Sequence, residues 1–370
     1  MRTLPVCRED LWEYLSVCNK TIVLYGMGNG ADKILAVCQG KGITVKGVFA
    51  SDGFVRQKLF HGMPVRSWGD VKAQYGEDNL IVLLSFGTSR EDVLENILRI
   101  AGEAELYAPD VPAFGDTLFD RAFYDAHRDA FNKARALLFD EKSRRIFDNV
   151  VSYKLTGKID YLLDAESDED TVWRTIVHPE RLRACADLGA YNGDTVRELI
   201  EKSGESIETI YALEPDARNY KKLEAYAAAE TRCQVLPVHA GAWCEATTLT
   251  FDTSGNRNAS FDVNRSLSLA DRPQKLTQIR AEALDDVLNG ARVDYIKYDV
   301  EGSEREALAG SVQTVQAYAP TLLVSLYHRS EDLFALPLQI QRDFPCYNRY
   351  YLRRRRGIPA WDINLYVTKE

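Results

Sequence analysis

The sequence predicts an α/β protein with two mostly parallel sheets, and two observations carry that prediction. Short β-branched apolar runs, such as 20–26 (KTIVLYG), 79–86 (NLIVLLSF) and 293–299 (VDYIKYD), are typical of buried strands. Segments with helical apolar spacing follow most of these runs, and such alternation is typical of a parallel sheet. Because 370 residues are enough for two hydrophobic cores, we expect two α/β domains joined by helices.

The first domain is expected over residues 1–112. Strands are predicted at 20–26, 44–51 and 79–86, and the segment 105–112 (ELYAPDVP) closes the unit. The glycines of 26–30 (GMGNG) bend the chain after the first strand, and helices are predicted from Ala31 and from Ser89.

A helical linker region is expected over residues 113–178. The segment 123–155 has helical apolar spacing with charged residues on its other faces, which predicts one or two linking helices. The acidic run 166–170 (ESDED) is expected to be a solvated turn.

The second domain is expected over residues 179–370. Helices are predicted after Asn192, Asp216, Arg280, Ser303 and Glu331. Strands are predicted at 184–189, 209–214, 234–239, 248–252, 293–299, 321–327, 347–353 and 363–369. The last two strands are expected to form an antiparallel hairpin across 354–362, and the arginine run 353–356 is interpreted as a solvated part of its loop.

Composition excludes several classes of protein. With 45% apolar residues, 27% charged residues and a net charge of −9, the chain has the profile of a globular protein without a general nucleic-acid surface. No apolar run approaches the roughly 18 residues that span a bilayer. The seven cysteines form no CxxC pair, and the start of the chain lacks a secretory pattern, so we expect a cytoplasmic location. A homo-oligomer is left open.

The stretch 185–196 (CADLGAYNGDTV) is the most informative motif. A glycine-rich bend after a strand can bring backbone close to a cofactor at Gly189 and Gly193. Backbone N–H groups of the bend and of the next helix start, at Ala190, Tyr191 and Asn192, can hold a carboxylate. Asp187 can accept from an ammonium group or order the loop. The alternative is a strand–turn–helix whose glycines serve only the turn.

A second acid follows at the end of the next strand, in 211–216 (YALEPD). Glu214 can accept hydrogen bonds from both hydroxyls of a ribose, with Pro215 and Asp216 beside it. The alternative is an ordinary acid at the start of a helix. The small residues Ala240 and Gly241, after the third strand, could admit an adenine ring, or form a tight turn without a ligand.

The third motif, 296–304 (IKYDVEGSE), gathers acids at the carboxyl end of a strand, where open α/β sheets bind ligands. Asp299 is expected to lie near the reacting methyl group of a bound cofactor. Glu301 could be a general base, a metal ligand or a helix N-terminal acid. His328 could remove a hydroxyl proton, with Asp299 or Glu301 as the substitute base, or could instead cap a helix or hydrogen-bond to Asp332. A set of Asp299, Glu301 and His328 around Mg²⁺ or Ca²⁺ is a further alternative.

The order and chemistry of these motifs point to S-adenosylmethionine rather than NAD, since the loop GAYNG is not GxGxxG. Together, DLGAYNGDT, YALEPD and DYIKYDVEGSEREALAGS resemble the FkbM family of S-adenosylmethionine-dependent methyltransferases, over about residues 183–370. The resemblance implies a class I methyltransferase fold and O-methylation of a hydroxyl of a sugar, glycan or natural product. The GMGNG half resembles the small Rossmann-like domains joined to such enzymes in bacterial carbohydrate biosynthesis.

Two other functions are alternatives to methyl transfer. An NAD-dependent nucleotide-sugar oxidoreductase or epimerase would use the GMGNG domain, and it predicts a Tyr-x-x-x-Lys pair. Tyr14, Tyr153, Tyr220 and Tyr318 are not followed by such a lysine. A non-catalytic nucleotide-binding scaffold is the other alternative, and the acids at 299–304 speak against it.

Overall fold

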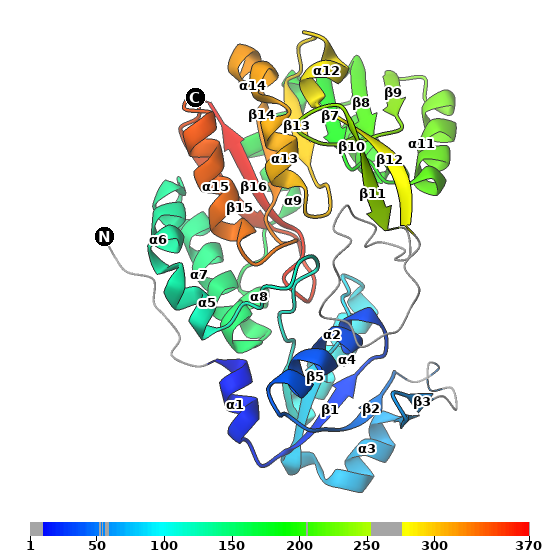
Figure 1. Ribbon diagram of the computed structural model, residues 1–370, viewed down its shortest axis with the longest axis vertical. Helices are drawn as coiled ribbons and strands as arrows, with labels where there is room; N and C mark the ends of the chain where they lie inside the picture. The colour runs from blue at the N-terminus through cyan, green and yellow to red at the C-terminus, as the bar shows by residue number, and fades with distance from the viewer. Residues whose placement is uncertain are drawn as a thin grey trace.

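The computed structural model describes residues 10–51, 53, 55, 59–204, 206–252 and 276–369. Two large, mostly parallel sheets lie toward opposite ends of the molecule, with a group of helices beside them (Figure 1). We call residues 10–112 the N-terminal unit, 113–178 the helical segment and 179–369 the C-terminal unit. The predicted α/β class with two such sheets is confirmed.

The N-terminal sheet has the strand order β3-β4-β2-β1-β5-β6, and only β3 is antiparallel to its neighbour. Its strands are β1 (Thr21–Tyr25), β2 (Val45–Phe49), β3 (Leu59–Phe60), β4 (Met63–Arg66), β5 (Leu80–Leu84) and β6 (Glu105–Tyr107). Its helices are α1 (Leu11–Val17), α2 (Asn29–Gly40), α3 (Trp68–Tyr75), η1 (Glu77–Asn79) and α4 (Glu91–Glu103). Sequence reasoning missed α1, α3, β3 and β4, which are too short to show a clear apolar period.

The helical segment is divided more finely than the expected one or two helices. Its elements are α5 (Arg121–Ala126), α6 (Arg128–Leu137), α7 (Glu141–Thr156), α8 (Asp160–Leu163), α9 (Glu169–Val172) and η2 (Trp173–Val177). The side chains of Asp120 and Asp140 accept hydrogen bonds from the backbone N–H groups of Phe123 and Ser143. These aspartates are N-caps, so each starts a new helix inside one continuous amphipathic pattern.

The C-terminal sheet has the order β15-β16-β14-β13-β7-β8-β9, with β16 antiparallel to both of its neighbours. Its strands are β7 (Ala184–Leu188), β8 (Thr209–Leu213), β9 (Gln234–Val238), β13 (Tyr295–Tyr298), β14 (Thr321–Ser325), β15 (Arg349–Arg354) and β16 (Ile363–Thr368). Its helices are η3 (Pro179–Arg181), α10 (Asp194–Ser203), α11 (Ala217–Ala229), α12 (Leu284–Leu288), α13 (Glu304–Ala309), α14 (Val312–Tyr318) and α15 (Asp332–Asp343). The predicted hairpin is therefore present as β15 and β16.

A small third sheet joins β10 (Gly241–Ala242), β12 (Leu276–Glu282) and β11 (Thr247–Asp252). Here the expectation of a helix directly after Arg280 needs correction, because Arg280 itself lies in β12 and α12 begins only at Leu284. The missed strand pairs antiparallel with β11. Its alternation of apolar and polar residues is short, and its partner lies far away in sequence.

The two units are connected by a shared hydrophobic core. One cluster of buried side chains runs from Val23 and Phe49 of the N-terminal sheet, through Phe131 and Phe147 of the helical segment, to Leu365 of β16. Helix α6 packs against α15, and α7 packs against β15. The helical segment thus fills the space between the sheets rather than acting as a loose linker.

The arginine run 353–356 is not the solvated loop that we expected. The side chains of Arg353 and Arg354 are only 8% and 1% exposed. The run makes ionic or hydrogen-bonded contacts with Asp140 (Arg353, 2.5 Å), the Leu162 carbonyl (Arg354, 2.9 Å), Glu198 (Arg355, 2.6 Å) and Glu91 (Arg356, 2.9 Å). These partners belong to both units and to the helical segment, so the run ties the three parts together.

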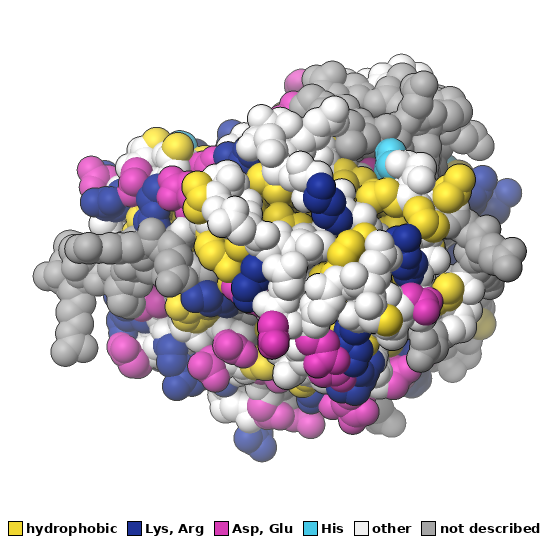
Figure 2. Space-filling model, turned by 90° about the horizontal axis from the view of Figure 1, so that it is seen from below, with side chains coloured by type: hydrophobic (Ala, Val, Ile, Leu, Met, Phe, Trp, Pro, Cys, Tyr) yellow, Lys and Arg dark blue, Asp and Glu magenta, His cyan; other side chains and the backbone are white. Residues whose placement is uncertain are grey.

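The surface carries charges of both signs. Figure 2 views the molecule from the end at which the N-terminal unit lies, and there Lys and Arg side chains are mixed with Asp and Glu side chains. In the described part of the chain, no helix combines the length and the apolar character needed to cross a bilayer. The six cysteines within the described residues are free thiols.

Candidate active site

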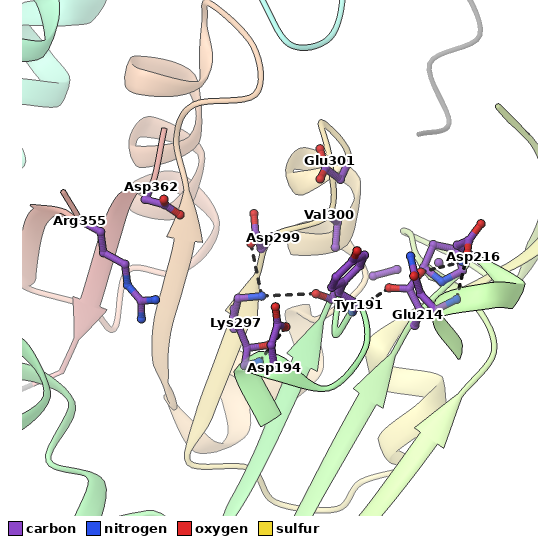
Figure 3. Close-up of a pocket in the computed structure, with 16 residues that line it drawn as sticks. Tyr191, Asp194, Glu214, Asp216, Lys297, Asp299, Val300, Glu301, Arg355 and Asp362 are labelled. Carbon is purple, nitrogen blue, oxygen red and sulfur yellow. Dashed lines mark hydrogen bonds and ion pairs between the residues drawn. The ribbon is translucent and has the colours of Figure 1, made fainter. Parts of the chain in front are cut away.

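Strand register brings the three predicted motifs to one edge of the C-terminal sheet. Leu188, at the end of β7, pairs with Leu213 of β8 and with Tyr298 of β13. The residues that follow these three strand ends are Gly189, Glu214 and Asp299, and all three line one cavity of about 340 Å³. Figure 3 shows Glu214 and Asp299 in this lining. The carboxyl ends of parallel strands are where such a sheet binds ligands.

The predicted site residues divide into two groups. Those that line this cavity, which we call the sheet-edge cavity, are Gly189, Tyr191, Glu214, Pro215, Asp216, Gly241, Asp299 and Glu301. Those that do not are Asp187, Ala190, Asn192, Gly193, Ala240 and His328. Sequence reasoning missed Asp194, Thr195, Lys297, Arg355 and Asp362, which also line it. Asp194 could have been noticed from its position in the loop after a predicted strand, and Asp362 from its position in the predicted hairpin turn.

Gly189 is required by the protein itself. Its φ is +92°, and a Cβ there would overlap the backbone carbonyl of Asp299. The absent side chain therefore lets the β7 loop touch the β13 loop, a reason different from the close approach to a cofactor that the sequence suggested. Gly193, with φ +85°, does not line the cavity, and a Cβ there would face the ring of Tyr226. Its missing side chain therefore makes room for that ring.

Glu214 clamps two loops together with one carboxylate. Its Oε2 accepts from the backbone N–H of Tyr191 and its Oε1 accepts from that of Asp216, both at 2.8 Å. The side chain is 5% exposed. Burial raises the pKa of Glu214 to about 8, although the two N–H groups oppose that shift. Hydroxyl donors from a ribose would favour the ionised form, because a hydrogen bond to a charged group stabilises it.

A buried lysine organises the floor of the sheet-edge cavity. The Nζ of Lys297 lies 3.2 Å from Asp187 and 3.4 Å from Asp299. Burial alone would lower the pKa of Lys297, but these carboxylates raise it above its ordinary value, so the group is an ammonium. Asp187 is fully buried and also accepts from the hydroxyl of Thr195, at the start of α10. Asp187 was expected either to accept from an ammonium group of a ligand or to order the loop, and these contacts correspond to the second role.

Asp299 is held ionised at the end of β13. Its Oδ1 accepts from the hydroxyls of Ser325 and Tyr327 at 2.8 and 3.0 Å. Burial would raise the pKa of Asp299, but Lys297, His328 and these hydroxyls lower it to about 2. A fixed negative charge therefore faces the sheet-edge cavity at any physiological pH.

His328 is buried among carboxylates. Its Nδ1 lies 2.8 Å from Glu304, and both side chains are 1% exposed. Its Nε2 lies 3.5 Å from Glu301 and 3.6 Å from Asp299, near enough for ionic attraction but without a hydrogen bond in the described structure. Burial would lower the pKa of His328, but the three carboxylates raise it to about 10, so the ring is an imidazolium at neutral pH.

Glu301 occupies the mouth of the sheet-edge cavity. Its φ of +54° is uncommon for a residue with a side chain, and such outliers concentrate at functional sites. Its side chain keeps 39% exposure, whereas His328 beside it keeps 1%. The partial burial raises the pKa of Glu301 to about 7, although the His328 charge opposes the shift. Glu301 is thus the acid in this group that can gain and lose a proton near neutral pH.

The chemistry of the lining fits a cationic nucleoside cofactor. Six carboxylates face the sheet-edge cavity (Asp194, Glu214, Asp216, Asp299, Glu301 and Asp362), with two cationic side chains (Lys297 and Arg355). S-adenosylmethionine carries a sulfonium and an ammonium against one carboxylate, so its charge complements this lining. The side-chain oxygen of Asn192, in the same bend, is buried with no hydrogen-bond partner among the described residues, but Asn192 does not line the cavity.

The metal-assisted alternative has less support. Within the described residues, no group of three or more His, Cys, Asp and Glu side chains is arranged to hold a metal ion. Asp299, Glu301 and His328 come close together, but the imidazolium has no lone pair free to bind a cation. We therefore derive no step through a metal ion.

The fold places an acid-lined cavity at the carboxyl edge of a mostly parallel sheet, where α/β proteins bind nucleoside cofactors. Residues 187–344 match the family model of the methyltransferase FkbM domain. The C-terminal unit therefore contains a region that matches the FkbM methyltransferase domain, as its motifs predicted, and this match supports a methyltransferase that uses S-adenosylmethionine.

One solved structure agrees with this fold over most of the chain. The methyltransferase FkbM from Methylobacillus flagellatus KT has a TM-score of 0.70 and 21% identity, and the match covers 94% of this chain and 90% of that chain. Fibrillarin from Aeropyrum pernix, solved with bound S-adenosyl-L-methionine, has a TM-score of 0.31 and 12% identity over 50% of this chain and 65% of that chain. A comparison with curated proteins finds no match.

We expect Gly189→Ala to damage both folding and the site. The added Cβ must displace the backbone at Asp299, so the free energy of unfolding should fall by more than about 2 kcal/mol. Gly42→Ala is the matched control, because Gly42 has φ +70° but no atom within 4 Å of an added Cβ, and strain alone costs about 1 kcal/mol. Thermal and urea unfolding of both variants would measure the difference. Equal losses would show that the loop contact is unimportant.

Proposed function

We propose that this protein is an S-adenosylmethionine-dependent O-methyltransferase that acts on a hydroxyl of a sugar, glycan or natural product. The observation that carries the proposal is the common register of Gly189, Glu214 and Asp299 around one acid-lined cavity. When bound, the cofactor supplies an electrophilic methyl group on a sulfonium.

Each part of the lining has a task in this proposal. Glu214 holds the ribose hydroxyls with the lone pairs that Tyr191 and Asp216 leave free. The amino-acid end of the cofactor lies near the start of α10 rather than on the bend itself, because the backbone N–H groups of Ala190 and Tyr191 already donate to the Leu213 carbonyl and to Glu214. Asp299 keeps its negative charge on the side of the cavity that would face the positive sulfur. Positioning of this kind accounts for much of the acceleration in such transfers.

We assign the general base to Glu301 in preference to His328. A base must be unprotonated before it accepts the proton of the attacking hydroxyl, and His328 is already protonated at neutral pH. Glu301, with a pKa of about 7, is ionised in a large fraction of molecules under the same conditions. The hydroxyl proton passes to the Glu301 carboxylate as the oxygen takes the methyl group, and the charge of His328 holds that carboxylate in place.

The NAD-dependent alternative is disfavoured by charge at the sheet-edge cavity. A pyrophosphate at the start of α10 would share the sheet-edge cavity with Asp194, Glu214 and Asp216. Negative charges gathered in one cavity repel each other, which is unfavourable for this ligand. In the N-terminal unit, β2 is followed by Ala50 and Ser51, which offer no carboxylate to the ribose of NAD. The next residue, Asp52, lies outside the described residues.

The proposal is tested by cofactor binding to wild type and Glu214→Ala. Calorimetry with S-adenosylhomocysteine should show binding by wild type and a dissociation constant at least about tenfold higher for the variant, since a charge-assisted hydrogen bond is worth roughly 1.5–3 kcal/mol. Glu224→Ala, at an exposed position of α11, is the control. Stabilisation by NAD but not by S-adenosylhomocysteine in a thermal-shift comparison would reject the proposal.

A further inference from the structure

A second cavity, of about 450 Å³, lies between the N-terminal and C-terminal units. The glycine bend before α2 and the end of β5 form one side of it. The segment after β14 and the turn between β15 and β16 form the other side. Glu301 and Asp362 line both this cavity and the sheet-edge cavity, so the two spaces meet at these carboxylates. We call the second space the inter-unit cavity.

Trp361 is the notable side chain of the inter-unit cavity. It is 47% exposed, although it lies in the turn of the hairpin that reaches toward the N-terminal unit (Figure 1). Its ring rests on Gly87, where any Cβ would overlap the indole. Next to this contact, Thr88 and Ile358 exchange two backbone hydrogen bonds of 2.8 and 3.0 Å. The backbone of one unit therefore fixes an exposed aromatic ring of the other.

The rest of the lining combines apolar surface with a few hydrogen-bonding groups. Phe86 and Tyr327 add aromatic surface, while Asn29, Glu301 and Asp362 offer acceptors. The buried Nε2–H of His328 makes no hydrogen bond within the described structure, and this residue also lines the cavity. Pockets that bind small molecules have this mixture of aromatic walls and a few convergent polar groups. A pyranose ring matches this lining, because it can stack its flat C–H face on the indole and direct its hydroxyls toward the carboxylates.

We propose that the inter-unit cavity is the acceptor site, that it takes a glycosyl ring, and that Trp361 is the surface on which this ring stacks. The N-terminal unit is then a necessary part of the acceptor site, because Gly87 and Thr88 set the position of Trp361. The inference rests on the proposed methyl transfer, since it places the acceptor hydroxyl at Glu301, where the two cavities meet.

The test uses the full-length protein saturated with S-adenosylhomocysteine and titrated with methyl glycosides of hexoses and deoxyhexoses, observed by saturation-transfer NMR. We expect at least one glycoside to bind through its ring C–H protons. Trp361→Ala should weaken that binding about tenfold, as an aromatic contact contributes about 0.5–1.5 kcal/mol beyond its buried area, while Trp361→Phe should recover most of it. Affinity for S-adenosylhomocysteine should stay unchanged, because Trp361 does not line the sheet-edge cavity.

Phe139→Ala is the matched control, because Phe139 is an aromatic residue of 46% exposure that does not line the inter-unit cavity. Gly87→Ala should reproduce the loss seen in Trp361→Ala by displacing the indole. Wild type that binds S-adenosylhomocysteine but no glycoside, or a Trp361→Ala variant with unchanged glycoside affinity, would overturn the inference and leave the proposed function standing. Wild type that does not bind S-adenosylhomocysteine would overturn the proposed function itself.

Discussion

Glu301→Gln is expected to lower kcat by about 100-fold or more, the usual range for a general base being roughly 10²–10⁴. The amide has nearly the shape of the carboxylate, and glutamine is strained to the same degree as glutamate by the positive φ at position 301, so the fold should be retained. It cannot accept a proton from the acceptor hydroxyl. Affinity for S-adenosylhomocysteine should change little, because the sheet-edge cavity keeps its other five carboxylates.

The pH profile makes this prediction specific. A base works only when ionised, so kcat/KM of wild type should rise as pH increases through about 7, the pKa of Glu301. In Glu301→Gln this rise should disappear, leaving a low and flat profile. Glu306→Gln, on the neighbouring helix α13 and outside both cavities, should keep the wild-type profile. A persistent rise near pH 7 in Glu301→Gln would assign the base elsewhere.

His328→Ala is expected to destabilise the protein by about 3–5 kcal/mol, the usual cost of leaving one member of a buried ion pair without its partner. The unpaired group would be Glu304, which is 1% exposed and otherwise accepts from the backbone N–H of Val300 at 2.9 Å. Turnover should fall more than cofactor affinity, because His328 lies outside the sheet-edge cavity. Urea unfolding and calorimetry would separate the two effects.

The sign of the pH dependence follows from the raised pKa. The imidazolium of His328 titrates at about 10 in the folded protein against about 6.5 in an unfolded chain, so its stabilising contribution is complete below about pH 6.5 and is lost as pH rises through about 10. The difference in stability between wild type and His328→Ala should therefore shrink across this interval. The double variant His328→Ala/Glu304→Ala should recover part of the loss, since it removes the stranded charge as well. A pH-independent difference, without recovery in the double variant, would contradict the ion-pair account.

The same variant distinguishes the two candidate bases. Without the imidazolium 3.5 Å away, the pKa of Glu301 should rise, because a nearby positive charge favours the ionised carboxylate. The rise in kcat/KM should then shift to higher pH but persist. If His328 were the base, the rise would vanish in His328→Ala.

Much of the site was predictable because parallel strands end at a common edge. Gly189, Glu214 and Asp299 each follow a buried apolar run, and that position alone indicates that they meet. The terminal hairpin also follows from two short apolar runs and the turn between them, whereas the strand order was not predicted. Lys297 could not be assigned in this way, since within its strand it resembles any polar residue of an alternating pattern. Its role comes from Asp187, which is 110 positions away and opposite it in the register.

The sequence by itself determined the two sheets, the order of the three motifs and the chemistry of the cofactor they fit, because these depend on local periodicity and on which strand each residue follows. Only the tertiary structure decided the protonation of His328, the burial of Arg353 and Arg354, and the contact of Trp361 with Gly87. Each of these depends on burial and on charges or backbone brought from distant segments, and Coulomb and desolvation energies follow distance in space rather than separation along the chain.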